Sequence, residues 1–234
     1  MQPGLFDRRA VLRGTIIAGG VGLGMALAAC TSVPTPRPAH MPTLAPQAGH
    51  TGAEPKVVPP SRALLAYFSR AGENYYYGGR IQLQTGNTEV IAGMIGDQIT
   101  VDTFRIDAAD SYPDGYESTV QRNREEQRSN ARPAIVGDLP DIVRYDTVLL
   151  GCGVWNVRAP MIMRTFVDAL DFAGKSVHPF VTYAVSGMGN VRDDYVQFCA
   201  GASVSEGLAV QGEEAPNAGP KVNEWLSSIG LLSA

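Results

Sequence analysis

The sequence predicts an α/β domain in which a five-stranded parallel sheet is covered by helices on both faces. Short apolar runs alternate with segments of helical periodicity from about residue 61 onward. The chain has 234 residues, of which 44% are hydrophobic, and this is enough for one such domain with a core. In open sheets of this class, ligands bind beyond the carboxyl ends of the strands, so the loops at those ends are the candidate sites.

The first half of the domain begins with residues 63–68, a continuous apolar run typical of a strand buried on both faces. Apolar residues at helical spacing predict a helix over 88–98, and alternation predicts a second strand over 99–106. Residues 116–129 are polar and rich in helix formers, which indicates a solvated helix. Its charged residues are interpreted as a solvent-facing surface; they are Arg122, Arg124, Glu125, Glu126 and Arg128.

The second half continues the alternation. The apolar run within 146–151 predicts a third strand, and Pro160 at a favourable first-turn position predicts a helix that runs to about residue 171. The remaining predicted elements are strands over 179–185 and 202–210 and helices over 193–199 and 219–229.

The first sixty residues do not fit this domain. A basic segment at 7–13 precedes an uncharged apolar run at 14–29, which is short for a bilayer span of roughly 20 residues. Small residues then precede Cys30, so residues 1–30 are predicted to be a signal peptide. The arginine pair resembles a twin-arginine signal, and residues 27–30 resemble a lipoprotein cleavage box with Cys30 as the lipidated residue. An uncleaved membrane anchor is the alternative.

Residues 31–60 contain eight of the sixteen prolines and predict a disordered linker, which leaves 61–234 as the folded domain. Removing residues 1–29 takes away three arginines and one aspartate, so the net charge changes from −4 to −6. No basic stripe remains, which argues against nucleic acid as a partner. Cys152 and Cys199 are predicted to be buried thiols, with a disulfide as the alternative, and no metal-ligand cluster is evident.

The loop after the first predicted strand contains Ser69 and Arg70, and the next helix begins near Gly86, Asn87 and Thr88. Backbone amides at a helix N-terminus, together with hydroxyl groups, suit a phosphate. An N-cap without a ligand explains the same residues equally well.

The loops after the third and fourth strands also carry residues that a ligand could use. The first places Trp155 in a glycine-bearing loop at the ligand edge, where it could stack on a planar ligand, although packing is the alternative. The second contains two glycines, which allow close approach of the backbone to a ligand or simply form a turn. The residues concerned are Gly153, Val154, Trp155, Asn156 and Val157, and Ser186, Gly187, Met188 and Gly189.

In their order and spacing, these segments resemble the flavodoxin family. The resemblance covers roughly residues 61–231 and includes a Tyr-Pro-x-x-Tyr segment at 112–116; its other segments are 66–69, 86–88, 151–160 and 186–189. It implies a three-layer flavodoxin-like fold with strand order 2-1-3-4-5. It also implies FMN as the cofactor, with its phosphate bound by Ser69, Asn87, Thr88 and the backbone at Gly86.

The resemblance implies that Arg70 assists at the phosphate and that Trp155 stacks on the flavin ring. Backbone groups of 153–157 and 186–190 would contact the ring edge. Two departures from the family pattern stand out. The loop after the fourth strand offers only Met188 where a second aromatic often covers the flavin, and Asn156 stands where a glycine often permits a peptide flip.

Residues 72–84 form an insertion between the two halves of the phosphate site and are expected to loop out as a hairpin that turns at 78–79.

Together, the signal peptide and the family resemblance imply an FMN-binding electron-transfer protein that is anchored outside the cell membrane. Its expected partner is a redox protein or a small acceptor such as a quinone. Two alternatives remain, an FMN-dependent NAD(P)H:quinone-type reductase and a flavin-free binding module with the same fold.

Overall fold

The computed structural model describes residues 62–232. The predicted signal peptide, the lipidation at Cys30 and the linker over 31–60 lie outside the described residues. Within 62–232, no helix is both long and apolar enough to cross a membrane.

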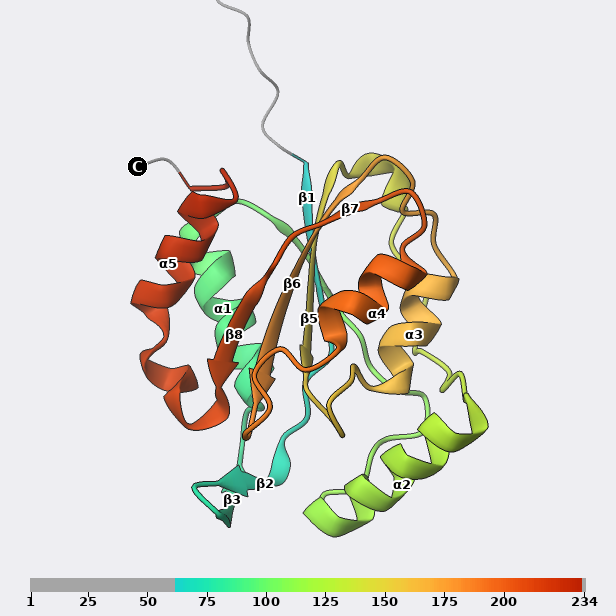
Figure 1. Cartoon of the computed structure of the whole chain (residues 1–234), viewed down its shortest axis with the longest axis vertical. Coiled ribbons are helices and arrows are strands. Elements are labelled where there is room, and N and C mark those ends of the chain that lie inside the picture. The colour runs from blue at the N-terminus through green and yellow to red at the C-terminus, as the bar shows by residue number, and fades with distance from the viewer. Residues whose placement is uncertain (1–61, 233–234) are drawn as a thin grey trace, which may run out of the picture. The chain divides into compact units, whose positions relative to one another are not determined.

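The main sheet of the described residues is parallel and has helices on both faces (Figure 1). The central strands are β4 (Asp102–Arg105), β1 (Ala63–Tyr67), β5 (Thr147–Gly153) and β6 (Ser176–Tyr183), adjacent in that order. The short strands β7 (Ser203–Val204) and β8 (Leu208–Gln211) both pair with β6. Counted along the chain as predicted, this is the order 2-1-3-4-5, so the predicted fold class is confirmed.

The fifth predicted strand is divided into β7 and β8. The two segments pair with different parts of β6, and the break between them lies opposite Pro179. Proline has no amide hydrogen to donate to a ladder. Gly207, in the break, has a φ of +81°, which lets the chain leave the sheet and return to it.

Two apolar clusters hold the helices to the sheet. On one face, α3 (Met161–Asp168) and α4 (Val191–Phe198) pack through fully buried residues such as Phe166 and Tyr195. On the other face, α1 (Asn87–Gln98) and α5 (Gly219–Ser228) pack through residues such as Ile91, Ile95 and Leu226. The prediction of α1 rests on apolar residues at helical spacing, and that of α3 on Pro160 at its first turn.

The prediction of two buried thiols is confirmed. Cys152 and Cys199 are both free and buried, and burial raises the pKa of each thiol to about 12. Both thiols therefore stay protonated at neutral pH and act as packing residues.

The remaining elements lie at the ends of the sheet. The 3₁₀ helix η1 (Ile142–Arg144) precedes β5, and η2 (Gly212–Asn217) follows β8 at the carboxyl end. The insertion forms an antiparallel hairpin, β2 (Gly72–Tyr76) with β3 (Gly79–Leu83). Its two turn residues, Tyr77 and Gly78, both have positive φ, so the hairpin turns one residue earlier than predicted.

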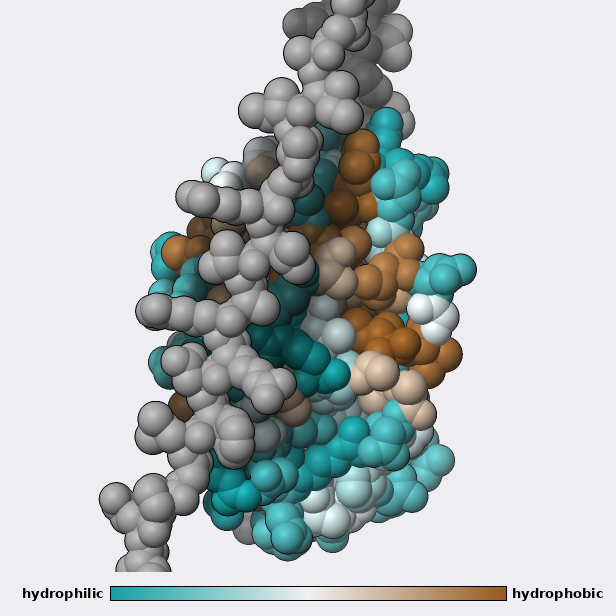
Figure 2. Space-filling view, turned by 90° about the vertical axis from the view of Figure 1, so that its right-hand side faces the viewer, coloured by the Kyte–Doolittle hydropathy of each residue, from teal (hydrophilic) through white to brown (hydrophobic). Residues whose placement is uncertain are grey.

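Helix α2 (Tyr116–Ser129) has the predicted bounds and lies at the carboxyl end of the sheet, beyond α3 (Figure 1). Its outer residues are exposed, and Figure 2 shows hydrophilic surface gathered at this end of the molecule. Its inner face is also polar but buried, with Thr119, Asn123 and Glu126. The interpretation of Glu126 as a solvent-facing residue is therefore wrong.

Candidate functional site at the carboxyl end of the sheet

A cleft of about 270 Å³ lies beyond the carboxyl ends of β1, β5 and β6. We call it the strand-end cleft. Its lining comes from the loops after β1 and β5, the first residues of α1, the end of β6, the hairpin, α2 and η2. The lining residues are Phe68, Ser69, Arg70, Asn74, Tyr75, Asn87, Thr88, Tyr116, Thr119, Val120, Asn123, Arg124, Gly153, Val154, Trp155, Asn156, Thr182, Tyr183, Ala184, Gly212 and Glu213.

The start of α1 presents unpaired amides to this cleft. The Ser69 Oγ accepts a hydrogen bond from the Glu89 amide at 3.1 Å, and the Gly86 carbonyl accepts from Glu89 and Val90. The backbone amides of Asn87 and Thr88 have no acceptor among residues 62–232. A helix N-terminus with two free amides and a nearby hydroxyl group can bind an anion without a metal ion.

Thr88 and Gly86 are held in place by close packing. The buried Thr88 hydroxyl lies 2.8 Å from the Thr182 hydroxyl, which connects the start of α1 to the end of β6. Gly86 is buried against the loop after β1, where a Cβ atom would lie 2.5 Å from the Arg70 carbonyl oxygen. The two halves of the predicted phosphate site are therefore adjacent in space, although the hairpin separates them in sequence.

Arg70 stabilises the loops around the cleft. Its guanidinium donates to the carbonyl oxygens of Pro113 and Asp114 at 3.1 and 2.9 Å, and also to that of Glu73. Burial lowers the pKa of Arg70, and the carboxylates of Asp114 and Glu73 oppose this shift. The side chain lines the cleft, and its hydrogen bonds join the loop after β1 to the segment before α2.

Trp155 occupies a tight turn after β5. Its amide donates to the Arg158 carbonyl at 2.8 Å, and the Arg158 amide donates back at 3.2 Å. Asn156 and Val157, between them, have φ values of +50° and +60°. Asparagine tolerates this region, but a β-branched valine is strained there, at a cost of about 1–3 kcal/mol.

Several contacts hold this strained turn. The Gln127 side chain donates to the Trp155 carbonyl at 3.1 Å and accepts from the Asn156 side chain at 2.7 Å. Arg158 forms an ion pair with the buried carboxylate of Asp194, which ties the turn to α4. The Trp155 ring meets Phe68 and Tyr112 edge-to-face, with centroids 5.5 and 5.1 Å apart. The half-buried ring is thus fixed in the wall of the cleft.

Comparison with known proteins identifies the family. A model described as flavodoxin matches residues 82–229, which is more than half of the chain. The chain belongs to the flavodoxin family. No curated protein matches the chain significantly.

Solved structures agree with this family. A structure described as a flavoprotein from Bacteroides eggerthii is 26% identical, with a TM-score of 0.57, and the match covers 72% of this chain and 98% of that one. A similar structure from Bacteroides uniformis is 25% identical, with a TM-score of 0.56 and coverage of 71% and 98%. A Lactobacillus acidophilus flavoprotein in complex with FMN is 19% identical, with a TM-score of 0.51 and coverage of 67% and 97%, and this likeness concerns the fold alone.

The flavodoxin fold brings most of the predicted site residues together. Eight of them line the strand-end cleft, namely Ser69, Arg70, Asn87, Thr88, Gly153, Val154, Trp155 and Asn156. Gly86 and Val157 lie next to lining residues. Whether these residues bind the cofactor stays a prediction.

In the loop after β6, Ala184 lines the cleft, but the four predicted site residues lie outside the lining; they are Ser186, Gly187, Met188 and Gly189. The Asn190 amide donates to the Val157 carbonyl at 2.7 Å, so this loop packs against the Trp155 turn. Met188 packs on the apolar core. The expected contact of this loop with a ligand therefore stays a prediction.

Sequence reasoning missed Asn74 of the hairpin, the lining residues of α2 other than Tyr116, the end of β6 and η2. The sequence also places tyrosines near the ligand edge, at 75–77, 112 and 116, and of these Tyr75 and Tyr116 line the cleft. Tyr112 instead packs against Trp155 and donates to Glu126 at 2.9 Å, and burial raises its pKa well above the ordinary value. No pattern in the sequence distinguishes the inner face of α2, because the outer face of this helix is equally polar.

Proposed function

We propose that this flavodoxin-family protein binds FMN in the strand-end cleft and transfers electrons. The observation that carries the proposal is a single cleft with free helix amides at Asn87 and Thr88 and an aromatic platform at Trp155. A phosphate suits the first feature and a planar ring the second. The family and the FMN complex of the Lactobacillus acidophilus flavoprotein support this proposal.

In this proposal, the amides of Asn87 and Thr88 and the Ser69 hydroxyl group bind the phosphate. Trp155 stacks on the ring, and backbone groups of the Trp155 turn contact its edge. FMN supplies the electron-transfer chemistry, and the protein sets its orientation and electrostatic environment. The fixed, strained turn makes a peptide flip next to the flavin costly, because Gln127 and Asp194 hold both of its ends.

The location of the protein is part of the proposal. A lipid on Cys30 and the proline-rich segment after it would anchor the domain to the outer side of the cell membrane. The acidic net charge does not favour nucleic acid as a partner. A twin-arginine signal fits this location because that route exports folded proteins.

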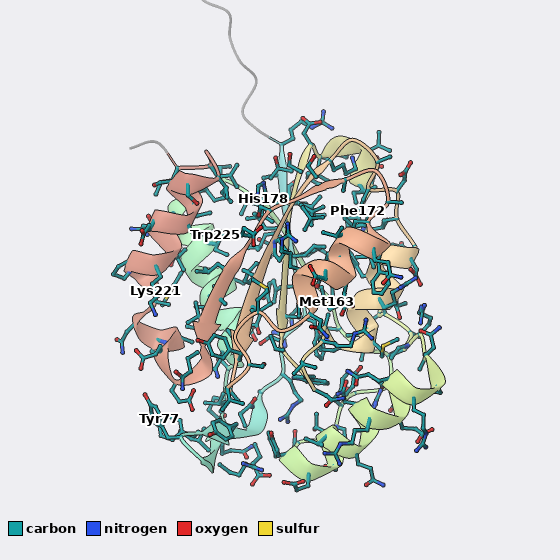
Figure 3. The ribbon with its side chains drawn as sticks, viewed as in Figure 1. Tyr77, Met163, Phe172, His178, Lys221 and Trp225 are labelled. Carbon is teal, nitrogen blue, oxygen red and sulfur yellow. The ribbon has the colours of Figure 1, made fainter. Side chains whose placement is uncertain are left out.

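FMN titration tests the cofactor assignment. The full-length protein is expected to quench FMN fluorescence on binding, and Trp155→Ala is expected to raise the dissociation constant roughly tenfold because it removes the stacking surface. Trp225→Phe is the control, because the second tryptophan lies on α5 in the core, away from the cleft (Figure 3). A protein that leaves FMN fluorescence unchanged would favour a flavin-free binding module.

Fractionation of expressing cells tests the anchor. Cys30→Ser is expected to move the protein from the membrane fraction to the soluble fraction, since it removes the thiol that would carry the lipid. Thr31→Ala should remain in the membrane fraction. If the Cys30→Ser variant also stays there, the apolar segment itself is the anchor and no lipid is needed.

A further inference from the structure

Buried polar atoms without a protein partner gather at the strand-end cleft. Among residues 62–232, six buried side-chain nitrogen or oxygen atoms have no hydrogen-bond partner, and three of them belong to residues that line this cleft. They are Arg70 Nε, Asn123 Oδ1 and Glu213 Oε2. The first is a donor, which suits an anion, whereas the other two are oxygens that can only accept. A ligand of the cleft is therefore expected to bring hydrogen-bond donors to Asn123 and Glu213.

Asn123 lies on the inner face of α2 and is only 3% exposed. Residues four apart share a helix face, so its neighbours on this face are Thr119 and Gln127. The Thr119 hydroxyl donates to two backbone carbonyl oxygens at 2.9 Å, and the Gln127 side chain donates to the Trp155 carbonyl at 3.1 Å. Asn123 therefore lies one turn from the residue that holds the Trp155 turn, and its side-chain oxygen has no such partner.

Glu213 reaches the cleft from η2. Its Oε1 accepts from the Tyr77 amide at 2.7 Å at the tip of the hairpin, which Figure 3 shows below the segment that connects β8 to α5. Its Oε2 is buried and has no partner within the described residues. Gly212, the residue before it, is buried against α1, where a Cβ atom would lie 2.5 Å from the Asn87 Nδ2. Glu213 therefore lies close to the free amides at the start of α1.

We propose that Asn123 Oδ1 and Glu213 Oε2 bind the ribityl chain of FMN by accepting hydrogen bonds from its hydroxyl groups. This inference rests on the proposed function and assigns two residues that the proposed function leaves without a role. The ribityl chain joins the phosphate to the ring, so it has to run from the start of α1 to the Trp155 turn. Glu213 lies close to the first of these features, and Asn123 lies close to the second.

The other polar groups of FMN suit these two oxygens less well. The phosphate dianion and the carbonyl oxygens of the ring are acceptors, so they cannot pair with an acceptor. The N–H of the oxidised ring is a donor, but a single N–H cannot pair with two oxygens on separate elements. The hydroxyl groups of the ribityl chain can, because several of them are spread along the chain. The two oxygens are therefore expected to select flavins that carry a polyol chain.

Two flavins without a phosphate isolate this contact. Riboflavin carries the ribityl chain, and lumiflavin has a methyl group in its place on the same ring. Each is titrated into the full-length protein, and fluorescence gives the dissociation constant. The parent is expected to bind riboflavin at least roughly tenfold more tightly than lumiflavin, because only riboflavin donates to both oxygens. A parent that binds riboflavin no more tightly than lumiflavin would overturn the proposal.

Asn123→Leu removes one of the two acceptors. It is expected to raise the dissociation constant of riboflavin roughly three- to tenfold, the loss expected for one hydrogen bond, and to leave that of lumiflavin within about twofold. Asn123→Asp is the matched variant, because it keeps an oxygen acceptor and should keep the preference for riboflavin. Retained lumiflavin binding shows that the site is folded. Equal losses for both flavins in Asn123→Leu would contradict a role toward the ribityl chain.

Stability gives a second readout for Asn123. Asn123→Leu removes a buried oxygen that has no partner in the cofactor-free protein, so the urea midpoint of that protein should not fall. A residue whose role is structural would show the reverse, with a lower midpoint and weaker binding of both flavins. Lower affinity for riboflavin without a loss of stability is the combination that the proposal requires.

Glu213→Leu removes the second acceptor and is expected to raise the dissociation constant of riboflavin roughly tenfold, since hydrogen bonds to a charged group are the stronger ones. Glu214→Leu is the control for a loosened hairpin. The exposed Glu214 carboxylate accepts only from the Tyr77 hydroxyl, at 3.1 Å, and Glu214 does not line the cleft. This variant should bind riboflavin as the parent does. Equal losses in the two variants would show that the position of the hairpin, and not the Glu213 oxygen, determines the affinity.

Titration with FMN separates this inference from the proposed function. If FMN does not bind the parent protein, the proposed function fails and the ribityl contacts fail with it. If FMN binds, but Asn123→Leu and Glu213→Leu weaken riboflavin no more than lumiflavin, only the assignment of these two residues is wrong.

Discussion

Gly86→Ala is expected to abolish or severely weaken FMN binding, raising the dissociation constant at least roughly tenfold, and to destabilise the fold by about 1–3 kcal/mol. The added Cβ would lie 2.5 Å from the Arg70 carbonyl oxygen and would also overlap the Ser69 hydroxyl. Relief requires a shift of the loop after β1 or of the start of α1. Either shift moves Ser69 away from the free amides that are proposed to hold the phosphate.

The backbone conformation of Gly86 makes this a purely steric test. Its φ of −68° and ψ of 148° are accessible to alanine, so no conformational strain is added. Gly115, at the corresponding position before α2, has nearly the same angles, and a Cβ there would meet only the Ser118 side chain at 3.1 Å. Gly115→Ala should therefore leave FMN affinity within about twofold. Equal losses in both variants, measured by fluorescence titration, would contradict the packing argument.

Gly151→Ala is expected to lower the free energy of unfolding by about 1–3 kcal/mol or more, whereas Gly93→Ala is not expected to lower it. Gly151 pairs with Phe180 on the neighbouring strand. A Cβ at Gly151 would lie 2.5 Å from the Phe180 Cε1 and closer still to two other ring atoms. The ring is fully buried, so it has no free space into which to move.

Gly93→Ala is the matched comparison, because nothing lies within 4 Å of a Cβ at this exposed position of α1. It should stabilise the protein by about 0.5–1 kcal/mol, since alanine favours a helix more than glycine does. Combining Gly151→Ala with Phe180→Leu should recover part of the loss, because the smaller side chain makes room. Urea unfolding measures the three variants and the parent, and a Gly151→Ala variant as stable as the parent would show that Phe180 can move.

The sheet and its helices could be predicted because their signals are local. The continuous apolar run at 63–68 indicates a buried strand, and the spacing of Ile91 and Ile95 indicates a helix, without knowledge of the rest of the chain. The first and last residues of the strands could not be predicted in the same way. The strand predicted over 179–185 is β6 at Ser176–Tyr183, because Ser176 and Val177 already pair with both β5 and β7. Such pairing depends on residues far along the sequence.

The cleft could be predicted only in part for the same reason. The free amides of α1 and the Trp155 turn are short segments with recognisable composition. Asn123 and Arg124 look like members of a charged, solvated helix, and only the position of α2 at the carboxyl end of the sheet places them beside the cleft. The hydrogen bond from the Tyr77 amide to the Glu213 carboxylate of η2 joins residues 136 positions apart, and no local pattern indicates it.

The contacts between Tyr77 and η2 also affect the order in which parts of the domain can fold during synthesis. Synthesis proceeds from the N-terminus, so the hairpin leaves the ribosome long before Glu213 and Glu214, its partners in η2. The strands β1, β4, β5 and β6, the free amides of α1 and the Trp155 turn come earlier in the chain, but the tip of the hairpin lacks its two carboxylate partners until η2 has been made. During biogenesis, the segments that form the proposed cofactor site are therefore made before the segment that holds the tip of the hairpin.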